Sequence, residues 1–267
     1  MFSNTTVWIT GASSGIGEAF AKKIVTDGAS LILSARNEAE LNRVKGECQA
    51  LAPDAKILVL PMDVTDEASM PAKVEAAKNF TGRIDYLFNN AGISQRSLAV
   101  DTTMDTYRKL FEVDVFGQIA LTKLVLPIMI NQGSGHMMVT ASVAGKIGVP
   151  YRTGYCAAKH AMMGFFDALR AEVAGNNIKV TTITPGFIQT NISKNALKGD
   201  GTEFGRTDTN IATGMPVDTC IDVILAKMKK GEPEILVAQG KEAQAVWLKR
   251  FFPKALFKAV VNMGKPT

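Results

Sequence analysis

Short apolar runs alternate with amphipathic stretches along almost the whole chain, and this alternation restricts the fold more than any other feature of the sequence. Strands are predicted at residues 6–10, 30–35, 56–61, 86–89, 135–140, 179–184 and 234–237. Helical patterns lie between them, for example at residues 15–27 and 38–51. Runs such as VWIT and ILVL are apolar at every position, as expected when helices cover both faces of a parallel sheet.

These elements predict an α/β fold, a Rossmann-like doubly wound parallel β-sheet flanked by helices. We expect a single domain over residues 1–267, because the chain has no internal repeat and no linker rich in Pro, Gly and Ser. One polar, glycine-punctuated segment at about residues 191–216 is too long for an ordinary connection, and a substrate loop or lid is predicted there. A solvated excursion with a short helix is the alternative.

Charge and cysteine content disfavour several other classes of protein. The net charge of +5 arises in the tail, since residues 241–267 hold six basic residues against Glu242 alone, which leaves 24 basic and 24 acidic residues in 1–240. A nucleic-acid partner is therefore not predicted. The three cysteines fit neither a disulfide nor a metal-ligand pattern, so no metal is expected and a reducing, cytoplasmic location is favoured. We expect no signal peptide and no membrane span, because no run approaches ~18 uninterrupted apolar residues.

The first strand ends in TGASSGIG at residues 10–17, with glycines at 11, 15 and 17. This GxxxGxG spacing departs from the common GxGxxG fingerprint, but glycines before a helix N-terminus still allow a diphosphate to approach backbone N–H groups. The second strand lacks the acid that would accept from the ribose 2′-OH of NAD, and Arg36 follows it instead. An arginine suits a 2′-phosphate, so NADP(H) is favoured over NAD(H).

Five motifs occur in order: TGASSGIG, NNAG at residues 89–92, Ser142, a YxxxK pattern from Tyr155 to Lys159, and PGFIQT at residues 185–190. In these motifs the chain resembles the short-chain dehydrogenase/reductase family over roughly residues 5–237. With its long C-terminal extension it is similar to the branch that includes hydroxysteroid dehydrogenases. YxxxK alone would occur by chance in many proteins, whereas the five motifs together are specific.

The resemblance implies a set of cofactor-binding residues. They are Gly11, Ser13, Ser14, Gly15, Ile16 and Gly17 in the phosphate turn, Arg36 at the 2′-phosphate, Asp63 and Val64 at the adenine, Asn90, Ala91 and Gly92 along the nicotinamide half, and Pro185, Gly186, Ile188 and Thr190 near the carboxamide. Tyr155 and Lys159 would also bind the nicotinamide ribose side.

The resemblance also implies catalytic roles, and the chemistry explains the residue types. A phenol ordinarily ionises near pH ~10, which makes it a reluctant proton donor and acceptor at neutral pH. An ammonium one helical turn away stabilises the phenolate, so Lys159 would tune Tyr155 as the general acid/base. Ser142 would hydrogen-bond the substrate carbonyl where negative charge develops.

One residue departs from the family pattern. The family usually has an Asn in the helix before the Ser142 strand, whose main-chain carbonyl anchors a water that links the Lys to solvent, and FEVDVFG places Asp114 there. Asp114 has the shape of Asn without the amide donor. The relay could therefore survive, operate with an altered pH dependence or be impaired. We expect activity to persist, because Ser142, Tyr155 and Lys159 are intact.

The tail at about residues 240–267 is predicted to be a helical extension with an apolar stripe beside basic residues, interrupted at Pro253. Packing on the substrate cleft or on another subunit is favoured, and a basic amphipathic segment lying on a membrane is the alternative. The sequence thus predicts an NADP(H)-dependent oxidoreductase that interconverts a carbonyl and a secondary alcohol, acts on an apolar substrate and forms a homo-oligomer. A 3-oxoacyl carrier-protein reductase and a non-catalytic NADP-binding sensor are the alternatives.

Overall fold

A computed structural model describes residues 1–261. The order of elements is β1 (Thr6–Thr10), α1 (Gly15–Val25), β2 (Ser30–Ser34), α2 (Glu38–Leu51), β3 (Ile57–Val59), α3 (Met70–Thr81), β4 (Tyr86–Asn89), η1 (Ala99–Asp101), α4 (Met104–Phe111), η2 (Glu112–Phe116), α5 (Gly117–Gln132), β5 (Gly135–Thr140), η3 (Val143–Gly145), α6 (Thr153–Glu172), η4 (Ala174–Asn176), β6 (Ile178–Pro185), α7 (Thr209–Ala212), α8 (Val217–Lys229), β7 (Glu234–Val237), α9 (Gly240–Phe251) and α10 (Pro253–Val261).

All seven predicted strands are present, and the fold-class prediction is confirmed. The strands form one parallel sheet in the order β3-β2-β1-β4-β5-β6-β7. The predicted ends differ slightly: β2 ends one residue early, β3 is limited to three residues, and β6 extends by one residue at each end. The short β3 is an edge strand paired only with β2, which explains why fewer of its residues join the ladder.

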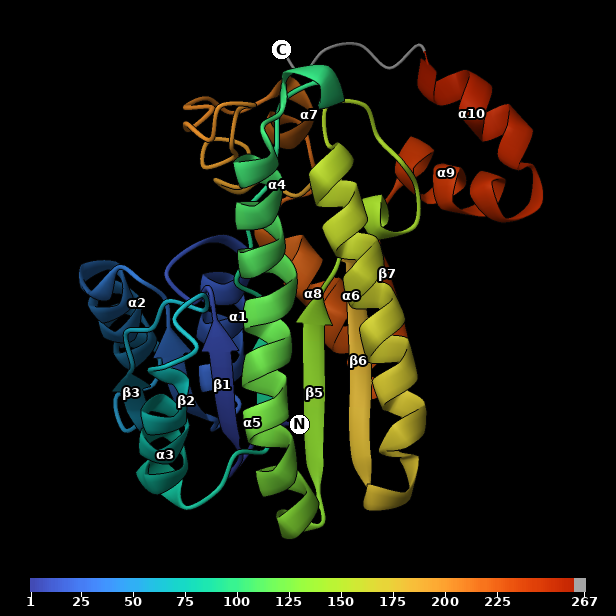
Figure 1. Cartoon of the computed structure of the whole chain (residues 1–267). Helices are drawn as coiled ribbons and strands as arrows, with labels where there is room; N and C mark the ends of the chain where they lie inside the picture. Colours follow the sequence, from blue (N-terminus) through green and yellow to red (C-terminus); the bar gives the residue numbers. More distant parts are fainter. Residues whose placement is uncertain (262–267) are drawn as a thin grey trace.

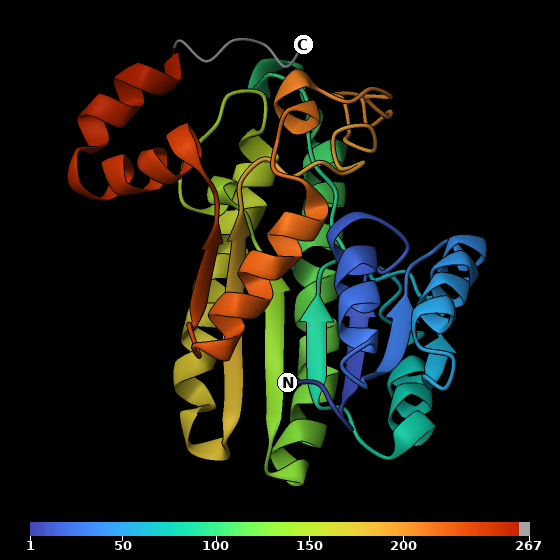
Figure 2. The ribbon, with the colours of Figure 1, turned by 180° about the vertical axis from the view of Figure 1, so that it is seen from behind.

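Helices cover both faces of the sheet, as the apolar strands predict (Figures 1 and 2). On one face α1, α2 and α8 bury residues such as Phe20, Leu41 and Ile224 against the strands. On the other face α3, α5 and α6 bury residues such as Val74, Leu121 and Phe166. The strands between these layers are mostly buried, and all five residues of β1 are at most 2% exposed.

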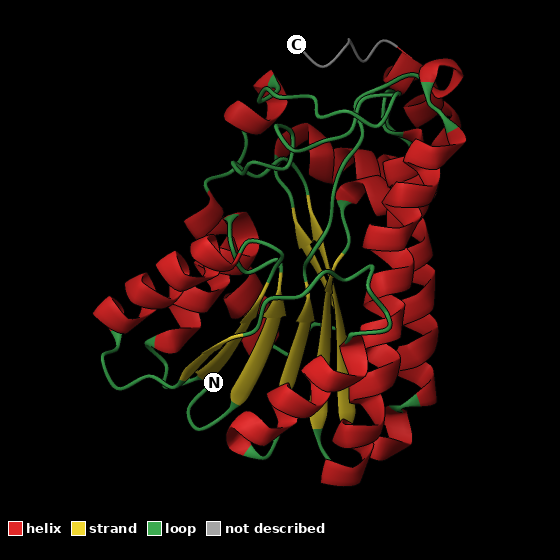
Figure 3. Ribbon diagram, turned by 60° about the vertical axis from the view of Figure 1, so that its left-hand side comes forward, coloured by secondary structure: helices red, strands yellow, loops and turns green. Residues whose placement is uncertain are grey.

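The order of the strands fixes where a ligand can bind. From β1 the chain winds outward through β2 and β3, and it then returns to β4 on the other side of β1. Loops that leave adjacent strands in opposite directions open a crevice at the carboxyl ends of the strands. Figure 3 shows the loops gathered at that end of the sheet, to which the strand arrows point.

One helical run in the described residues, Met104–Gln132, is long and apolar enough to cross a membrane by length and composition alone. It comprises α4, η2 and α5, and 44% of its most apolar window is buried inside the protein. η2 is a single π-helical turn, and it brings Asp114 to a fully buried position facing the sheet end. π-Helical turns are frequent at functional sites.

The predicted loop and tail both lie at the same end of the molecule. The segment at 191–216 is a folded loop that contains the short α7, which agrees with its polar, glycine-rich sequence. The tail forms α9 and α10, and Pro253 begins the second helix where the stripe was predicted to be interrupted. Residues 262–267 of the predicted extension lie outside the described residues.

Candidate active site

A cleft of about 880 Å³ opens at the carboxyl ends of the strands. It is lined by seventeen of the predicted cofactor-binding residues together with Ser142, namely Gly11, Ser13, Ser14, Gly15, Ile16, Arg36, Asp63, Val64, Asn90, Ala91, Gly92, Ser142, Tyr155, Lys159, Pro185, Gly186, Ile188 and Thr190, where Tyr155 and Lys159 were also predicted to be catalytic. Gly17 and Asp114 do not line it. The cleft thus gathers residues that are up to 179 positions apart in the chain, between Gly11 and Thr190.

The phosphate turn is shaped for a close backbone approach. Gly11 has φ of +64°, and a Cβ there would lie 2.9 Å from the Cα of Ala91. A Cβ on Gly17 would lie 2.4 Å from the carbonyl oxygen of Gly11, which explains why Gly17 is required although it faces away from the cleft. Ser14 precedes α1 without a side-chain capping bond, so the first N–H groups of the helix are left for a ligand. These features fit the diphosphate of a dinucleotide.

The loop after β4 is braced against the first strand. The Thr10 hydroxyl accepts from the backbone N–H groups of Asn90 and Ala91 at 3.0 and 3.1 Å. The Asn90 amide donates to the carbonyl oxygens of Thr10 and Gly11, and its oxygen accepts from the Thr140 hydroxyl at 2.9 Å. The phosphate turn, the NNAG loop and the end of β5 are therefore held as one rigid wall of the cleft.

Tyr155 and Lys159 lie on one face of the first turns of α6, as their spacing predicts. The buried Lys159 ammonium lies 5.6 Å from the centre of the Tyr155 ring and donates to the carbonyl oxygen of Thr140 at 3.0 Å. Ser142 follows β5, where its hydroxyl donates to the carbonyl oxygen of Pro185 at 3.3 Å and accepts from the N–H of Ala144. The long bond to Pro185 is weak, so the hydroxyl can turn to a ligand oxygen in the cleft.

Asp114 lies directly behind this group. Its Oδ2 is 3.7 Å from the Lys159 ammonium, and its Oδ1 accepts from the N–H of Ile93 at 2.7 Å. Burial raises the pKa of the Asp114 carboxyl, while the charge of Lys159 and the Ile93 hydrogen bond act in the opposite direction. Burial has the larger effect and the pKa is raised on balance, while the carboxyl lies within ion-pair distance of the lysine, a contact that the sequence did not predict for this position.

The end of β2 offers one free cationic side chain to the cleft. The Ser34 hydroxyl accepts from the indole N–H of Trp8 at 2.9 Å and is directed into the core. Arg36 is exposed beside Asn37, which caps α2, and no ion pair joins this arginine to any residue within 1–261. The acid at this side of the cleft, Glu40, is held by Arg43 at 2.8 Å. Arg36 is thus available to a phosphate.

A buried ionic cluster that was not predicted from the sequence holds the loop at 191–216. Arg96, in the segment after β4, lies 2.7 Å from Asp208, and the two side chains are 2% and 0% exposed. Arg152, three residues before Tyr155, approaches the same carboxylate at 3.3 Å. These charges lower the pKa of Asp208 against the opposing effect of burial. The loop is therefore fastened to the start of α6, and no local sequence signal identifies a pair 112 residues apart.

A second missed residue supports the catalytic helix directly. Gln95 is fully buried, and its side-chain oxygen accepts from the N–H of Gly154 at 2.7 Å. Its amide nitrogen donates to the hydroxyls of Ser97 and Thr102, each at 3.0 Å. Gln95 thus satisfies a free donor at the start of α6 next to Tyr155.

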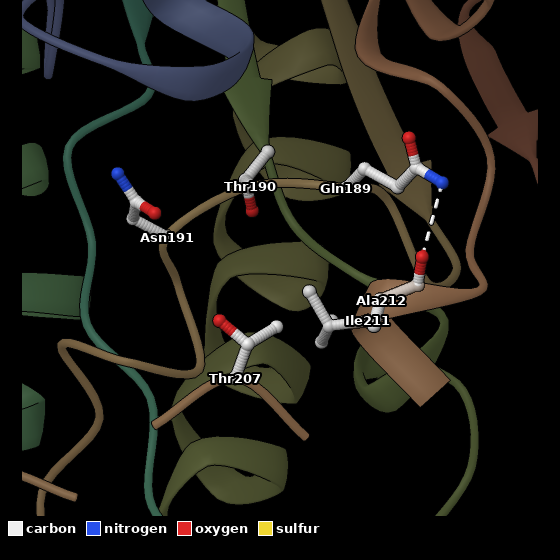
Figure 4. A pocket seen from close by; sticks show the side chains of 6 residues that line it. All are labelled: Gln189, Thr190, Asn191, Thr207, Ile211 and Ala212. Carbon is white, nitrogen blue, oxygen red and sulfur yellow. Dashed lines mark hydrogen bonds between the residues drawn. The ribbon is translucent and has the colours of Figure 1, made fainter. Parts of the chain in front are cut away.

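A smaller pocket of about 330 Å³ adjoins the cleft beneath α7. Figure 4 shows Thr190, Asn191 and Ile211, which also line the large cleft, around this space. The Gln189 amide donates to the carbonyl oxygen of Ala212 at 3.1 Å and closes one side. Residues from both ends of the 191–216 segment therefore line the cleft and the smaller pocket beside it.

A family model described as short chain dehydrogenase matches residues 5–201. The dehydrogenase/reductase SDR family protein 7-like of Drosophila melanogaster is 42% identical over 253 residues, which are 94% of this chain and 78% of that protein. The human dehydrogenase/reductase SDR family member 7 is 41% identical over 262 residues, which are 97% of this chain and 77% of that protein.

Solved structures have the same fold. Levodione reductase superposes with a TM-score of 0.81 at 30% identity and covers 91% of this chain and 99% of its own. A short chain dehydrogenase/reductase from Burkholderia phymatum, solved in complex with NAD, has a TM-score of 0.84 at 25% identity over 95% of each chain. The region matched by the family model, residues 5–201, includes the phosphate turn, the NNAG loop, Ser142 and the helix that carries Tyr155.

Proposed function

The chain belongs to the short-chain dehydrogenase family, and from that premise we propose that it is an NADP(H)-dependent oxidoreductase that interconverts a carbonyl and a secondary alcohol. The observation that carries the proposal is the single cleft that brings Ser142, Tyr155 and Lys159 together with the phosphate turn. When bound, the cofactor supplies or accepts the hydride. The residues of the cleft bind the cofactor, orient the substrate carbonyl and transfer one proton.

Tyr155 is the proposed general acid in reduction and general base in oxidation. Lys159 holds positive charge beside the phenol, which favours the phenolate over the neutral form. Its own position is fixed by Thr140 and Asp114. Ser142 would donate to the substrate oxygen on which negative charge develops, in exchange for its weak bond to Pro185.

Arg36 supports the preference for NADP(H), because it is exposed at the cleft and has no acidic partner within 1–261. Replacing Arg36 by Ala should lower the preference for NADPH over NADH in kcat/KM by about 10-fold or more, since a charge-assisted bond to phosphate contributes about 1.5–3 kcal/mol. Arg108→Ala, which removes an exposed arginine on α4, is the control. An unchanged ratio would contradict the assignment of Arg36.

The substrate is proposed to be an apolar ketone or alcohol of medium size, such as a steroid-like, retinoid-like or lipid-derived compound. Apolar residues of the loop and of α7, among them Ile192, Leu197 and Ile211, line the cleft and support this class. NADPH consumption should be measured with such ketones and with a 3-oxoacyl thioester as the rival substrate. Preference for the thioester would favour a 3-oxoacyl carrier-protein reductase.

A non-catalytic NADP-binding sensor is the second candidate, because the Asp114 carboxylate neutralises a lysine that the mechanism needs. Tight NADPH binding without turnover on any compound of the panel would favour the sensor. Turnover that is lost in Tyr155→Phe, with NADPH affinity retained, would favour the enzyme.

We further propose a homo-oligomer in the cytoplasm. Exposed apolar side chains along the run α4, η2 and α5, namely Met104, Phe116 and Ile130, offer a face for a second copy. The three cysteines are free and buried, which suits a reducing compartment. Light scattering of the full chain tests the subunit count, and a monomer at all concentrations would contradict it.

A further inference from the structure

Helices α9 and α10 carry a dense group of exposed aromatic residues, which we call the outer face. Trp247, Phe251, Phe252 and Phe257 expose between 52% and 60% of their surface, and Val261 exposes 78%. The Trp247 ring lies 5.2 Å from that of Phe251 and 5.5 Å from that of Phe252, measured between centroids. Contiguous exposed apolar patches commonly mark interaction sites.

The opposite side of the same helices is packed on the body of the protein. Leu256 is 4% exposed and lies in a small apolar cluster with Val143 and Ile147, which follow β5 in the chain. The Glu242 carboxylate accepts from the N–H of Phe187 at 3.1 Å. The packing predicted for the tail is therefore present on one side, and it fixes the position of the outer face relative to the cleft.

The charge around the outer face has one sign. Five basic residues lie on these two helices: Lys241, Lys249, Arg250, Lys254 and Lys258. Lys249 lies 4.3 Å from the centre of the Phe257 ring, so a cation is next to the aromatic group. The acid in residues 240–261 is Glu242, and it turns inward to Phe187. Aromatic residues bordered by Lys and Arg are typical of helices that lie at the surface of an anionic bilayer.

We propose that the outer face of α9 and α10 is a docking surface for an anionic lipid membrane. A second copy of this chain is a poorer occupant, because a two-fold interface would bring the same positively charged patches together. The position of α9 and α10 also favours a membrane. Figures 1 and 2 show both helices at the end of the sheet to which the strands point, which is also the end where the loop at 191–216 lies. Docking would bring the mouth of the cleft to the lipid surface, from which an apolar substrate can enter.

The test is sedimentation of the full chain with vesicles of phosphatidylcholine alone or of equal parts phosphatidylcholine and phosphatidylserine. A basic residue near an anionic surface contributes about a factor of 5 to the partition coefficient, so Lys254→Gln with Lys258→Gln should weaken binding about 30-fold. Phe251→Glu with Phe257→Glu should weaken it by at least about 10-fold, because the exposed rings no longer insert. Trp247 gives a second readout, since the other tryptophan, Trp8, is fully buried.

Matched control variants change exposed basic or apolar side chains that lie outside the outer face. Lys229→Gln with Lys230→Gln deletes two exposed charges at the C-terminal end of α8, and Leu51→Glu alters an exposed apolar residue at the end of α2. Both should sediment like wild type, and all variants should keep the wild-type melting temperature. No binding to the anionic vesicles, or equal binding by the outer-face variants, would overturn the proposal. So would a change of oligomeric mass in those variants without vesicle binding, which would identify an interface between copies. NADPH turnover is a separate measurement and does not enter this test.

Discussion

Replacing Asp114 by Asn tests how the buried carboxylate influences the proton chemistry of the site. Asp114 lies 3.7 Å from the Lys159 ammonium, which lies 5.6 Å from the centre of the Tyr155 ring, so the carboxylate is within about 9 Å of that ring. Two unit charges ~9 Å apart at an effective dielectric constant of ~20 interact by about 2 kcal/mol. This energy corresponds to a little more than one pH unit.

Asn keeps an oxygen for the Ile93 N–H but removes the negative charge, so the phenolate of Tyr155 becomes easier to form. Alcohol oxidation needs that phenolate as the base, and its rate rises with pH through a midpoint. We expect the midpoint of kcat/KM against pH to fall by up to about one unit in Asp114→Asn, because burial raises the pKa of Asp114 and so limits the charge that the substitution removes.

The assay is NADP⁺ reduction with the best alcohol substrate across the pH range, with Asp105→Asn as the control. Asp105 lies in α4 and its side chain is 91% exposed, so the same chemical change there should leave the profile unchanged. A midpoint that stays in place or moves to higher pH in Asp114→Asn would refute the reasoning. An inactive wild type that gains activity with Asn would contradict the expectation that activity persists with Asp at this position.

Three further outcomes are expected. Gly17→Ala should abolish measurable NADPH binding in a fluorescence titration, because its Cβ would lie 2.4 Å from the carbonyl oxygen of Gly11. His136→Gln should reduce the loss of stability in acid, because burial lowers the pKa of His136 from near 6.5 to about 4. The neutral imidazole's contribution to the free energy of unfolding is complete above pH 6.5 and is lost as the pH falls towards 4. In urea denaturation this loss should amount to about 3 kcal/mol. Asp208→Asn should cost about 3–5 kcal/mol and raise KM, because it leaves the buried Arg96 without its ion pair.

Two of these predictions have a matched comparison. Gly46→Ala in α2 meets no atom within 4 Å, so its NADPH affinity should equal that of wild type. Asp200→Asn changes an exposed carboxylate in the same loop as Asp208 and should leave the KM unchanged. Retained NADPH binding in Gly17→Ala, an unaltered acid transition in His136→Gln, or wild-type stability in Asp208→Asn would each contradict the corresponding contact.

The fold could be predicted because its signals are local. A continuously apolar run such as Thr6–Thr10 specifies a strand buried on both faces, and the four-residue spacing of Tyr155 and Lys159 specifies one helix face. The ends of the edge strand β3 were predicted less accurately, because the number of its residues that pair depends on β2 and not on the sequence of β3 alone.

Features that depend on distant contacts were not predicted. The Asp208 pair with Arg96 joins two loops, and neither sequence differs from an ordinary solvated loop. Asp114 was recognised as a departure from the family pattern, but its ion pair with Lys159 requires the π-helical turn of η2. Similarly, the periodicity of the tail indicated an apolar stripe, whereas the division into a packed side at Leu256 and an exposed side depends on its docking near Val143.

The central claim is that Tyr155 moves the proton beside a bound nicotinamide. Its most direct test is the single-turnover oxidation of enzyme-bound NADPH by the best ketone of the panel, compared between wild type and Tyr155→Phe with the cofactor Kd measured on the same samples. We predict that Tyr155→Phe weakens NADPH binding by no more than about 10-fold, for one lost hydrogen bond to the ribose, and loses about 10²–10⁴-fold in the rate of NADPH oxidation. A Tyr155→Phe protein that oxidises NADPH at the wild-type rate would contradict the account.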